Sequence, residues 1–252
     1  MRNPSLLSLA LALLASVAAA EEPNPRDPEA AQQYQHCIGL ARNSAMEGWH
    51  EALAWSSMGG GEPAQHCAAV AMIAMRQFDE GAVKLEALAE SSQAAPRLRA
   101  GMLAQAGQAW LLAKQPDRAY RAQSRALELV PGAPDLLVDR AQSLAEQKNY
   151  QGALQDLDEA LKAAPDRSDV LTLRATAKRY LDDFAGAKAD IAEALKLDAH
   201  NQDAWLEDGI EKNLAADVAG ARAAWQKVIA LAPQSDAAEM AKRDLELLDG
   251  ER

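Results

Sequence analysis

Two consecutive stretches of 34 residues decide the fold. Residues 134–167 read PDLLVDRAQSLAEQKNYQGALQDLDEALKAAPDR, and residues 168–201 read SDVLTLRATAKRYLDDFAGAKADIAEALKLDAHN. Small residues recur at the same places in both, for example Ala141 with Ala175 and Ala153 with Ala187. A fixed period of this length is typical of proteins built from stacked structural repeats.

The same period extends from about Ala100 to Ser235. The recurring columns are Ala119, Ala153, Ala187 and Ala221; Gly107, Ala141, Ala175 and Gly209; Leu103, Leu137, Leu171 and Trp205; and Pro131, Pro165, Ala199 and Pro233. Small residues let two helices approach closely, and a proline ends a helix. Each unit is therefore predicted to be a pair of antiparallel helices. At Ala199, where the proline is missing, we expect the helix to run slightly long.

These columns resemble the tetratricopeptide repeat, in which a large apolar residue, a small residue, an aromatic residue before an alanine, and a closing proline recur. The resemblance covers over half of the chain. It implies an all-α fold: a right-handed α-solenoid of about six helix-turn-helix repeats followed by a C-terminal capping helix. It also implies that stacked first helices line a concave groove, which takes an extended peptide or a partner helix.

The N-terminus has the layout of a signal peptide. Arg2 precedes an apolar run from Leu6 to Val17, and Ala18, Ala19 and Ala20 end it. We expect cleavage after Ala20 and no lipid, because no cysteine stands at the cut site; an uncleaved anchor is the alternative. These features predict an exported protein, in the periplasm if the host has one, with no membrane span in the mature chain.

The rest of the chain is expected to divide by the strength of the repeat. The predicted segments are a mature N-terminal extension at 21–27, degenerate repeats at 28–99, four regular repeats at 100–235, and a capping helix and tail at 236–252. In the degenerate part, Trp49 and Phe78 are interpreted as worn aromatic positions at the turn before a second helix.

Composition argues against nucleic acid as a partner. The formal net charge is −11, and lysine and arginine are interspersed among more numerous acidic residues. A phosphate backbone is instead bound by clustered positive charge. The acidic surface is more typical of a soluble protein or of one that binds basic partners.

Cys37 and Cys67 are the two cysteines of the chain, and each follows a histidine in a Gln-His-Cys triplet. In an exported protein an even pair of cysteines favours a disulfide. Two unbridged core thiols and a metal site that adds His36 and His66 are the alternatives. Neighbouring helical residues point about 100° apart, so each His-Cys pair converges poorly on one ion.

Charged residues also recur between the two helices of a hairpin. Arg140 and Arg174 lie on first helices, and Asp156 and Asp190 lie on second helices. We predict that Arg140 pairs with Asp156 and Arg174 with Asp190, as structural ion pairs that hold the hairpin angle. Asp135, Asp169 and Asp203 recur at the start of first helices, where they serve the helix N-terminus or face a ligand.

No catalytic motif and no cofactor motif is found, so the sequence indicates a non-enzymatic scaffold or adaptor without a cofactor. Helical spacing on the expected groove gives its candidate binding residues: Gln108, Leu111, Val138, Gln142, Thr172, Thr176, Arg179, Leu206, Ile210 and Asn213. Amide side chains and apolar side chains together suit an extended peptide. The alternatives are a regulatory or assembly subunit of an envelope enzyme, and a metal- or ligand-binding N-terminal region that uses the two His-Cys motifs.

Overall fold

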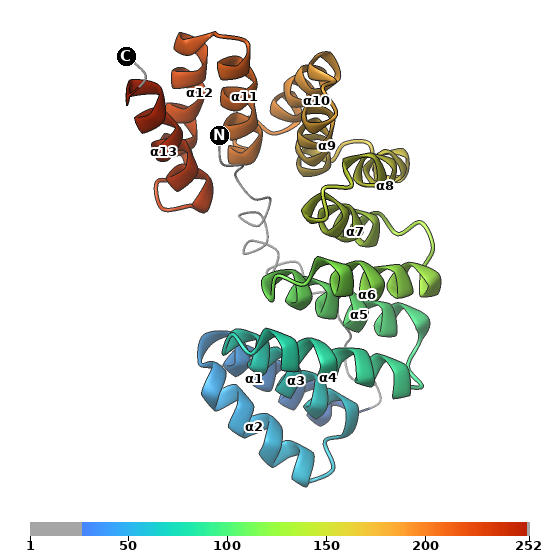
Figure 1. Cartoon of the computed structure of the whole chain (residues 1–252). Helices are drawn as coiled ribbons and strands as arrows, with labels where there is room; N and C mark the ends of the chain where they lie inside the picture. The colour runs from blue at the N-terminus through green and yellow to red at the C-terminus, as the bar shows by residue number, and fades with distance from the viewer. Residues whose placement is uncertain (1–26, 251–252) are drawn as a thin grey trace. The chain divides into compact units, whose positions relative to one another are not determined.

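The computed structural model describes residues 27–250, which form thirteen helices with no strand among them (Figure 1). The all-α class predicted from the repeat is thus confirmed. The expected signal peptide, residues 1–20, lies outside the described residues. Within residues 27–250, each helix is too short or too polar to cross a membrane.

The chain divides into two compact units at residue 131. The described part of the N-terminal unit, residues 27–131, contains three helix pairs. They are α1 (Pro28–Asn43) with α2 (Ala45–Ser57), α3 (Gly61–Ala74) with α4 (Phe78–Ser91), and α5 (Pro96–Leu112) with α6 (Pro116–Leu129).

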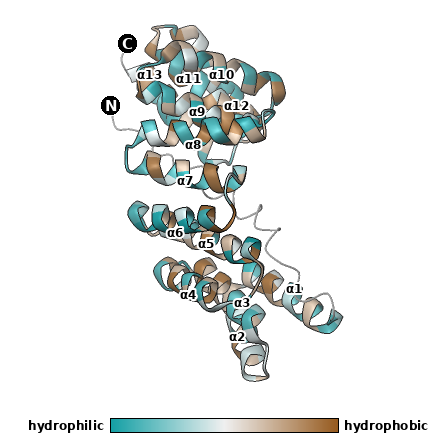
Figure 2. Cartoon of the chain, turned by 90° about the vertical axis from the view of Figure 1, so that its right-hand side faces the viewer, coloured by the Kyte–Doolittle hydropathy of each residue, from teal (hydrophilic) through white to brown (hydrophobic). Residues whose placement is uncertain are grey.

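The described part of the C-terminal unit, residues 132–250, contains three more pairs and a last single helix. They are α7 (Pro134–Glu146) with α8 (Tyr150–Ala163), α9 (Ser168–Tyr180) with α10 (Phe184–Leu197), α11 (Gln202–Leu214) with α12 (Val218–Leu231), and α13 (Asp236–Gly250). Figure 2 shows apolar and polar segments alternating along these helices, as expected where one stripe of each helix is buried.

Short polar side chains begin many of the helices. Asp27, Asn149, Asp183, Asn201 and Asp217 each accept hydrogen bonds from backbone N–H groups of the first turn that follows. The first N–H groups of a helix have no partner inside the helix, so such caps stabilise it by about 1 kcal/mol each. The first helix, α1, is therefore capped by Asp27.

The turns inside the hairpins share one backbone geometry. Lys114, Lys148, Asp182 and Ala216, which are spaced 34 residues apart, all have a φ of 60–63°. The residue after each donates its N–H to a carbonyl five residues earlier, as Gln115 does to Trp110. This is the Schellman ending of a helix, in which glycine is the usual left-handed residue. Arg76 ends α3 in the same way.

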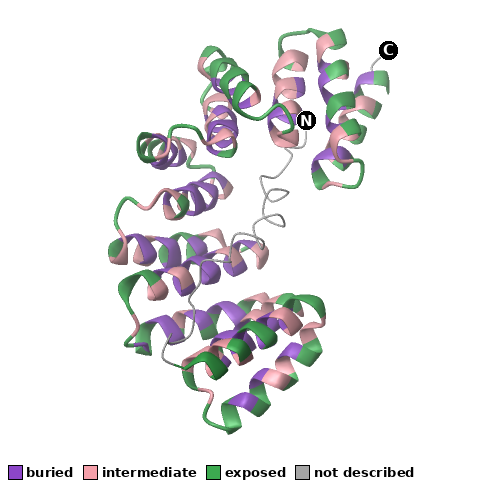
Figure 3. Ribbon diagram, turned by 180° about the vertical axis from the view of Figure 1, so that it is seen from behind, coloured by how far each residue is buried: buried purple, intermediate pink, exposed green. Residues whose placement is uncertain are grey.

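Small residues let the two helices of a hairpin approach. The fourth residue of every second helix is buried and small: Gly48, Gly81, Ala119, Ala153, Ala187 and Ala221. A Cβ atom at Gly107 would overlap Gln123, and one at Gly209 would overlap the ring of Trp225. Figure 3 shows the buried segments on helix sides that face neighbouring helices. The predicted role of the small columns is confirmed.

Two local predictions are wrong. Phe78 does begin α4, but Trp49 lies in the second turn of α2, which begins at Ala45. The small residue of that hairpin is Gly48, because a Cβ there would overlap the backbone of Ala41. Helix α10 also does not run long, since it ends at Leu197 with the same 14 residues as α8 and α12.

The last helix covers the last hairpin. Ala237, Ala238, Ala241 and Leu248 of α13 form one apolar cluster with Trp225 and other side chains of α11 and α12. A solenoid end needs such a cover because its final hairpin has no neighbour to bury its apolar face.

Candidate functional site

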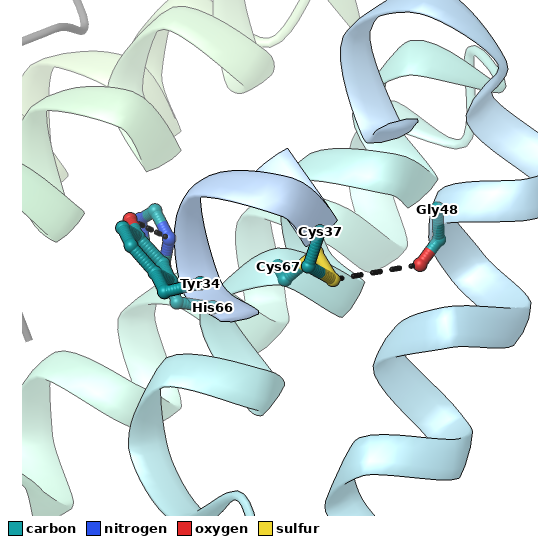
Figure 4. The surroundings of a disulfide bond; sticks show 5 residues. All are labelled: Tyr34, Cys37, Gly48, His66 and Cys67. Carbon is teal, nitrogen blue, oxygen red and sulfur yellow. Dashed lines mark hydrogen bonds between the residues drawn. A yellow bond between two sulfur atoms is a disulfide. The ribbon is translucent and has the colours of Figure 1, made fainter. Parts of the chain in front are cut away.

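A disulfide joins the first two hairpins of the N-terminal unit. Cys37 of α1 and Cys67 of α3 are bonded, their Cα atoms lie 6.1 Å apart, and both side chains are fully buried (Figure 4). The Cys37 Sγ lies 3.8 Å from the carbonyl oxygen of Gly48 on α2. The bond therefore fixes α1 against α3 inside a packed core.

A line of polar side chains runs beside the disulfide and connects three first helices. The Nδ1 of His66 on α3 lies 3.0 Å from the hydroxyl of Tyr34 on α1, and its Nε2 lies 2.9 Å from the Oε1 of Gln105 on α5 (Figure 4 shows the first pair). An amide oxygen only accepts, so Nε2 carries the proton and Nδ1 accepts from Tyr34. The three side chains are buried together.

His66 stays neutral in this setting. Burial lowers its pKa from 6.5 to about 4, although the hydrogen bond with Gln105 acts in the opposite direction, and the positive charge of Arg42 lowers the pKa further. A buried cation without a carboxylate partner is unfavourable, so the imidazole acts as a neutral connector between helices.

An open pocket lies among the same three helices. Its volume is about 250 Å³, and its apolar wall is formed by Val70 and Ile73 of α3 and by Ala109 and Leu112 of α5. Arg42 of α1 and two amides of α5, Gln105 and Gln108, supply its polar groups. Gln105 thus connects the pocket to the Tyr34–His66 line.

The arrangement does not suit a metal ion at the two His-Cys motifs. Both cysteines are joined in the disulfide, so neither offers a thiolate. Both ring nitrogens of His66 lie within hydrogen-bond distance of protein partners, whereas His36 is exposed. Among the described residues, no group of three or more possible ligands lies close enough to hold a metal.

The structure joins both predicted Arg–Asp pairs in the C-terminal unit. Arg140 reaches Asp156 with two hydrogen bonds of 2.7 and 2.8 Å, and Arg174 reaches Asp190 with two of the same lengths. Asp156 and Asp190 are buried, and Asp190 also contacts Lys178 at 2.8 Å. A bidentate pair of this kind fixes both distance and angle between two helices.

A third ion pair lies between hairpins. Arg179 of α9 bonds Glu207 of α11, which is buried, and its guanidinium lies 4.5 Å from the ring centre of Tyr180. That ring in turn stacks on Tyr150 with centres 4.2 Å apart. Arg179, expected from the sequence to face a groove, therefore ties neighbouring hairpins together.

The structure buries most of the side chains that the sequence placed on the groove. Leu111, Val138, Gln142, Thr172, Thr176 and Leu206 are buried, and Gln108, Arg179, Ile210 and Asn213 are partly buried. Thr172 and Thr176 donate their hydroxyls to backbone carbonyls one turn earlier on α9. Of the ten, Gln108 lines the open pocket.

Gln105 and Arg42 line the pocket but are not among the candidate residues predicted from the sequence. Gln105 belongs to a 34-residue column that continues with Asp139, Leu173 and Glu207, and its three polar members are all buried. A polar residue that recurs at a buried repeat position in an alanine-rich helix indicates that Gln105 has a role inside the fold. Arg42 has no such signal, because it lies in the last turn of a helix in the part of the chain where the repeat is degenerate.

The three recurring aspartates have different surroundings. Asp135 and Asp169 are exposed and both accept hydrogen bonds from Arg167. Burial and the nearby charge of Asp236 raise the pKa of Asp203 from 3.8 to about 6. Each lies in the first turn of its helix, where the helix dipole favours a carboxylate.

The fold is that of a helical-repeat protein. It consists of successive helix pairs, each packed through a small residue, followed by a capping helix, and its first helices line a pocket. Residues 106–178 match the family profile of the tetratricopeptide repeat, so this part of the chain carries tetratricopeptide repeats. No curated protein matches the sequence.

Solved structures share the fold at low sequence identity. A tetratricopeptide repeat protein from Parabacteroides merdae is 14% identical, with a TM-score of 0.67 over 96% of this chain and 97% of its own. MamA from Desulfovibrio magneticus RS-1 is 19% identical, with a TM-score of 0.58 over 69% of this chain and 97% of its own.

YrrB, described as a tetratricopeptide-repeat protein with an unusual peptide-binding site, is 16% identical. Its TM-score is 0.52 over 75% of this chain and 96% of its own. At these identities the likeness concerns the fold.

Proposed function

We propose that this protein is a non-enzymatic interaction scaffold that binds a peptide or a helix of a partner protein on its first helices. The observation that carries the proposal is the preformed pocket of about 250 Å³ between α1, α3 and α5. A rigid surface with an existing cavity gains affinity because little ordering is needed when a ligand binds.

The internal ion pairs favour a scaffold as well. Arg140, Arg174 and Arg179 each bond a buried carboxylate of a neighbouring helix. Their role is to hold hairpins in place, which is the property a binding surface needs. The peptide-binding site named for YrrB, a protein of the same fold, is consistent with this use.

We further propose that the protein works outside the cytoplasm, in a periplasm or comparable envelope compartment. The fully buried disulfide suits an oxidising compartment, where such bonds form and persist. The signal-peptide pattern of residues 1–20 supports the same location.

Affinity purification from an envelope extract tests the proposal. The full chain carries a C-terminal tag, and mild cross-linking of the cells that produce it precedes extraction. We expect at least one protein to be recovered at a constant ratio to the tagged chain, and to be lost when an exported, unrelated tagged protein replaces it. Recovery of the same proteins with both baits would contradict a specific scaffold.

A further inference from the structure

We propose that the pocket between α1, α3 and α5 binds one large apolar side chain of an extended peptide whose next residue is aspartate or glutamate. This inference rests on the proposed function and specifies the ligand chemistry of its site.

The size and wall of the pocket select an apolar side chain. An apolar cavity of about 150 Å³ is large enough for a benzene ring, so 250 Å³ accommodates a leucine or phenylalanine side chain. Val70, Ile73, Ala109 and Leu112 provide the contact surface. Burying such a side chain contributes about 1.5–3 kcal/mol, which makes it the main anchor.

The charge of the pocket selects a carboxylate. Arg42 is the charged residue among those that line it, within a protein of formal net charge −11. Its guanidinium is close enough to His66 to lower the pKa of the imidazole. His66 is neutral, so the rim carries one positive charge, which is complementary to an acidic side chain and not to a basic one.

The two amides select a peptide backbone. Gln105 and Gln108 stand one turn apart on α5, and each amide has both a donor and an acceptor end. His66 donates to the oxygen of Gln105, so the NH₂ end of that amide is directed away from His66. A peptide group needs a donor and an acceptor at close spacing, which a hydrocarbon ligand does not use.

The pocket is held in shape by its own helices. The Cys37–Cys67 bond ties α1 to α3, and the Tyr34–His66–Gln105 line ties both to α5. Each of the three helices that provide pocket residues is therefore joined to another by the disulfide or by a hydrogen bond. The ligand then meets a site that is already formed.

Peptide titrations of the ¹⁵N-labelled full chain test the inference. The probes are four acetylated and amidated heptapeptides in glycine and serine, with Leu-Asp, Ala-Asp, Leu-Asn or Leu-Lys at the centre. We expect the Leu-Asp peptide to shift amide signals of Ala109 and Leu112. Affinity is expected to fall about tenfold with Ala-Asp and about fivefold with Leu-Asn, and further with Leu-Lys.

Two variants locate the binding. Ala74 lines the pocket from an exposed position at the end of α3, so Ala74→Trp fills the opening without disturbing the core. Arg42→Gln removes the charge. We expect the first to abolish binding of the Leu-Asp peptide and the second to make Leu-Asp and Leu-Asn equal. Ala87→Trp and Arg121→Gln, at exposed positions of α4 and α6, serve as controls without effect.

The outcomes separate this inference from the scaffold function. Equal binding of Leu-Asp and Ala-Asp, or binding that survives Ala74→Trp, overturns the pocket assignment and leaves the scaffold proposal standing. Absence of binding by all four peptides also overturns it. The scaffold proposal fails separately, by the loss of a specific partner in the purification described above.

Discussion

Arg140 and Asp156 illustrate how single residues set the hairpin geometry. Two short hydrogen bonds join them, and the Asp156 carboxylate is 8% exposed while the arginine side chain is 24% exposed. Removing the Asp156 carboxylate leaves the partly buried guanidinium of Arg140 without its main hydrogen-bond acceptor. We expect Asp156→Ala to lower the free energy of unfolding by about 2–3 kcal/mol, measured by urea unfolding followed by circular dichroism.

A surface pair provides the matched control for that measurement. Glu193 and Lys196 bond within α10, and both are exposed. We expect Glu193→Ala to change the free energy of unfolding by less than about 0.5 kcal/mol, because exposed ion pairs contribute little. Similar losses for both variants would show that the Arg140–Asp156 pair does not act as an internal brace.

Asp203 gives the C-terminal unit a pH dependence of its own. Burial, with a smaller effect of Asp236, raises the pKa of this carboxyl from 3.8 to about 6. The folded state therefore holds a proton here more tightly than the unfolded state. The free energy of unfolding therefore falls as the pH rises from about 4 through 6, and this fall is complete about one pH unit above 6.

Replacing the carboxyl by an amide tests this effect. We expect Asp203→Asn to raise the free energy of unfolding at pH 7 by about 2 kcal/mol and to have little effect at pH 4. Urea unfolding of both proteins between pH 4 and 8 measures it. A gain of the same size at both pH values would exclude the raised pKa as its cause.

The residue contacts differ in how far they could be predicted. Arg140–Asp156 and Arg174–Asp190 follow from the repeat, since both pairs span 16 residues within one hairpin. The contact of His66 with Gln105 spans 39 residues and joins different hairpins. Such a contact depends on how hairpins stack, which the local pattern does not contain. The pocket could not be predicted for the same reason.

At the scale of helices and turns, the hairpin turns carry a strained residue that glycine would relieve. Ala216 ends α11 with a φ of 61°. This left-handed conformation costs a residue with a Cβ atom about 1 kcal/mol, and glycine adopts it without that cost. We expect Ala216→Gly to raise the free energy of unfolding by about 0.5–1 kcal/mol in urea unfolding.

The same substitution inside a helix should act in the opposite direction. Ala189 is exposed in the middle of α10. We expect Ala189→Gly to lower the free energy of unfolding by about 1 kcal/mol, because glycine loses more conformational freedom in a helix. A destabilising effect of glycine at Ala216 as well would contradict the role assigned to the turn.

The disulfide is the covalent link between two helix pairs. It closes a loop of 30 residues. Its removal therefore lowers the free energy of the unfolded chain by about 3–4 kcal/mol, because the unfolded chain regains conformational entropy. We expect the double variant Cys37→Ser, Cys67→Ser to lose stability by about that amount. Hydrogen exchange should then show faster exchange in α1 and α3, while α7 to α13 keep their rates; uniform acceleration would contradict a local link.

The helices themselves were largely predictable, because small residues and prolines recur every 34 residues from Ala100 onward. Prediction failed where the pattern is worn, as at Trp49, because an aromatic residue alone does not show which small residue meets the partner helix. It also did not reveal the turns, because Lys114, Lys148, Asp182 and Ala216 are not residues that indicate a left-handed backbone.

For the whole molecule, the two compact units differ in how their first helices are used. In the C-terminal unit, most residues of the predicted groove are buried and Arg179 bonds Glu207, while Ile210 and Asn213 are partly buried. In the N-terminal unit, the three first helices that the disulfide and the polar line connect also line an open pocket. We therefore propose that a partner binds on α1, α3 and α5.

Site-specific photo-cross-linking of the full chain in the cells that produce it tests this claim most directly. A photoreactive phenylalanine derivative replaces Gln108 at the pocket or, as the control, Arg121 on the exposed side of α6. We predict a discrete protein adduct from position 108 that is absent from position 121 and is lost when Ala74→Trp is added. Adducts of equal yield from both positions, or none from position 108, would contradict it.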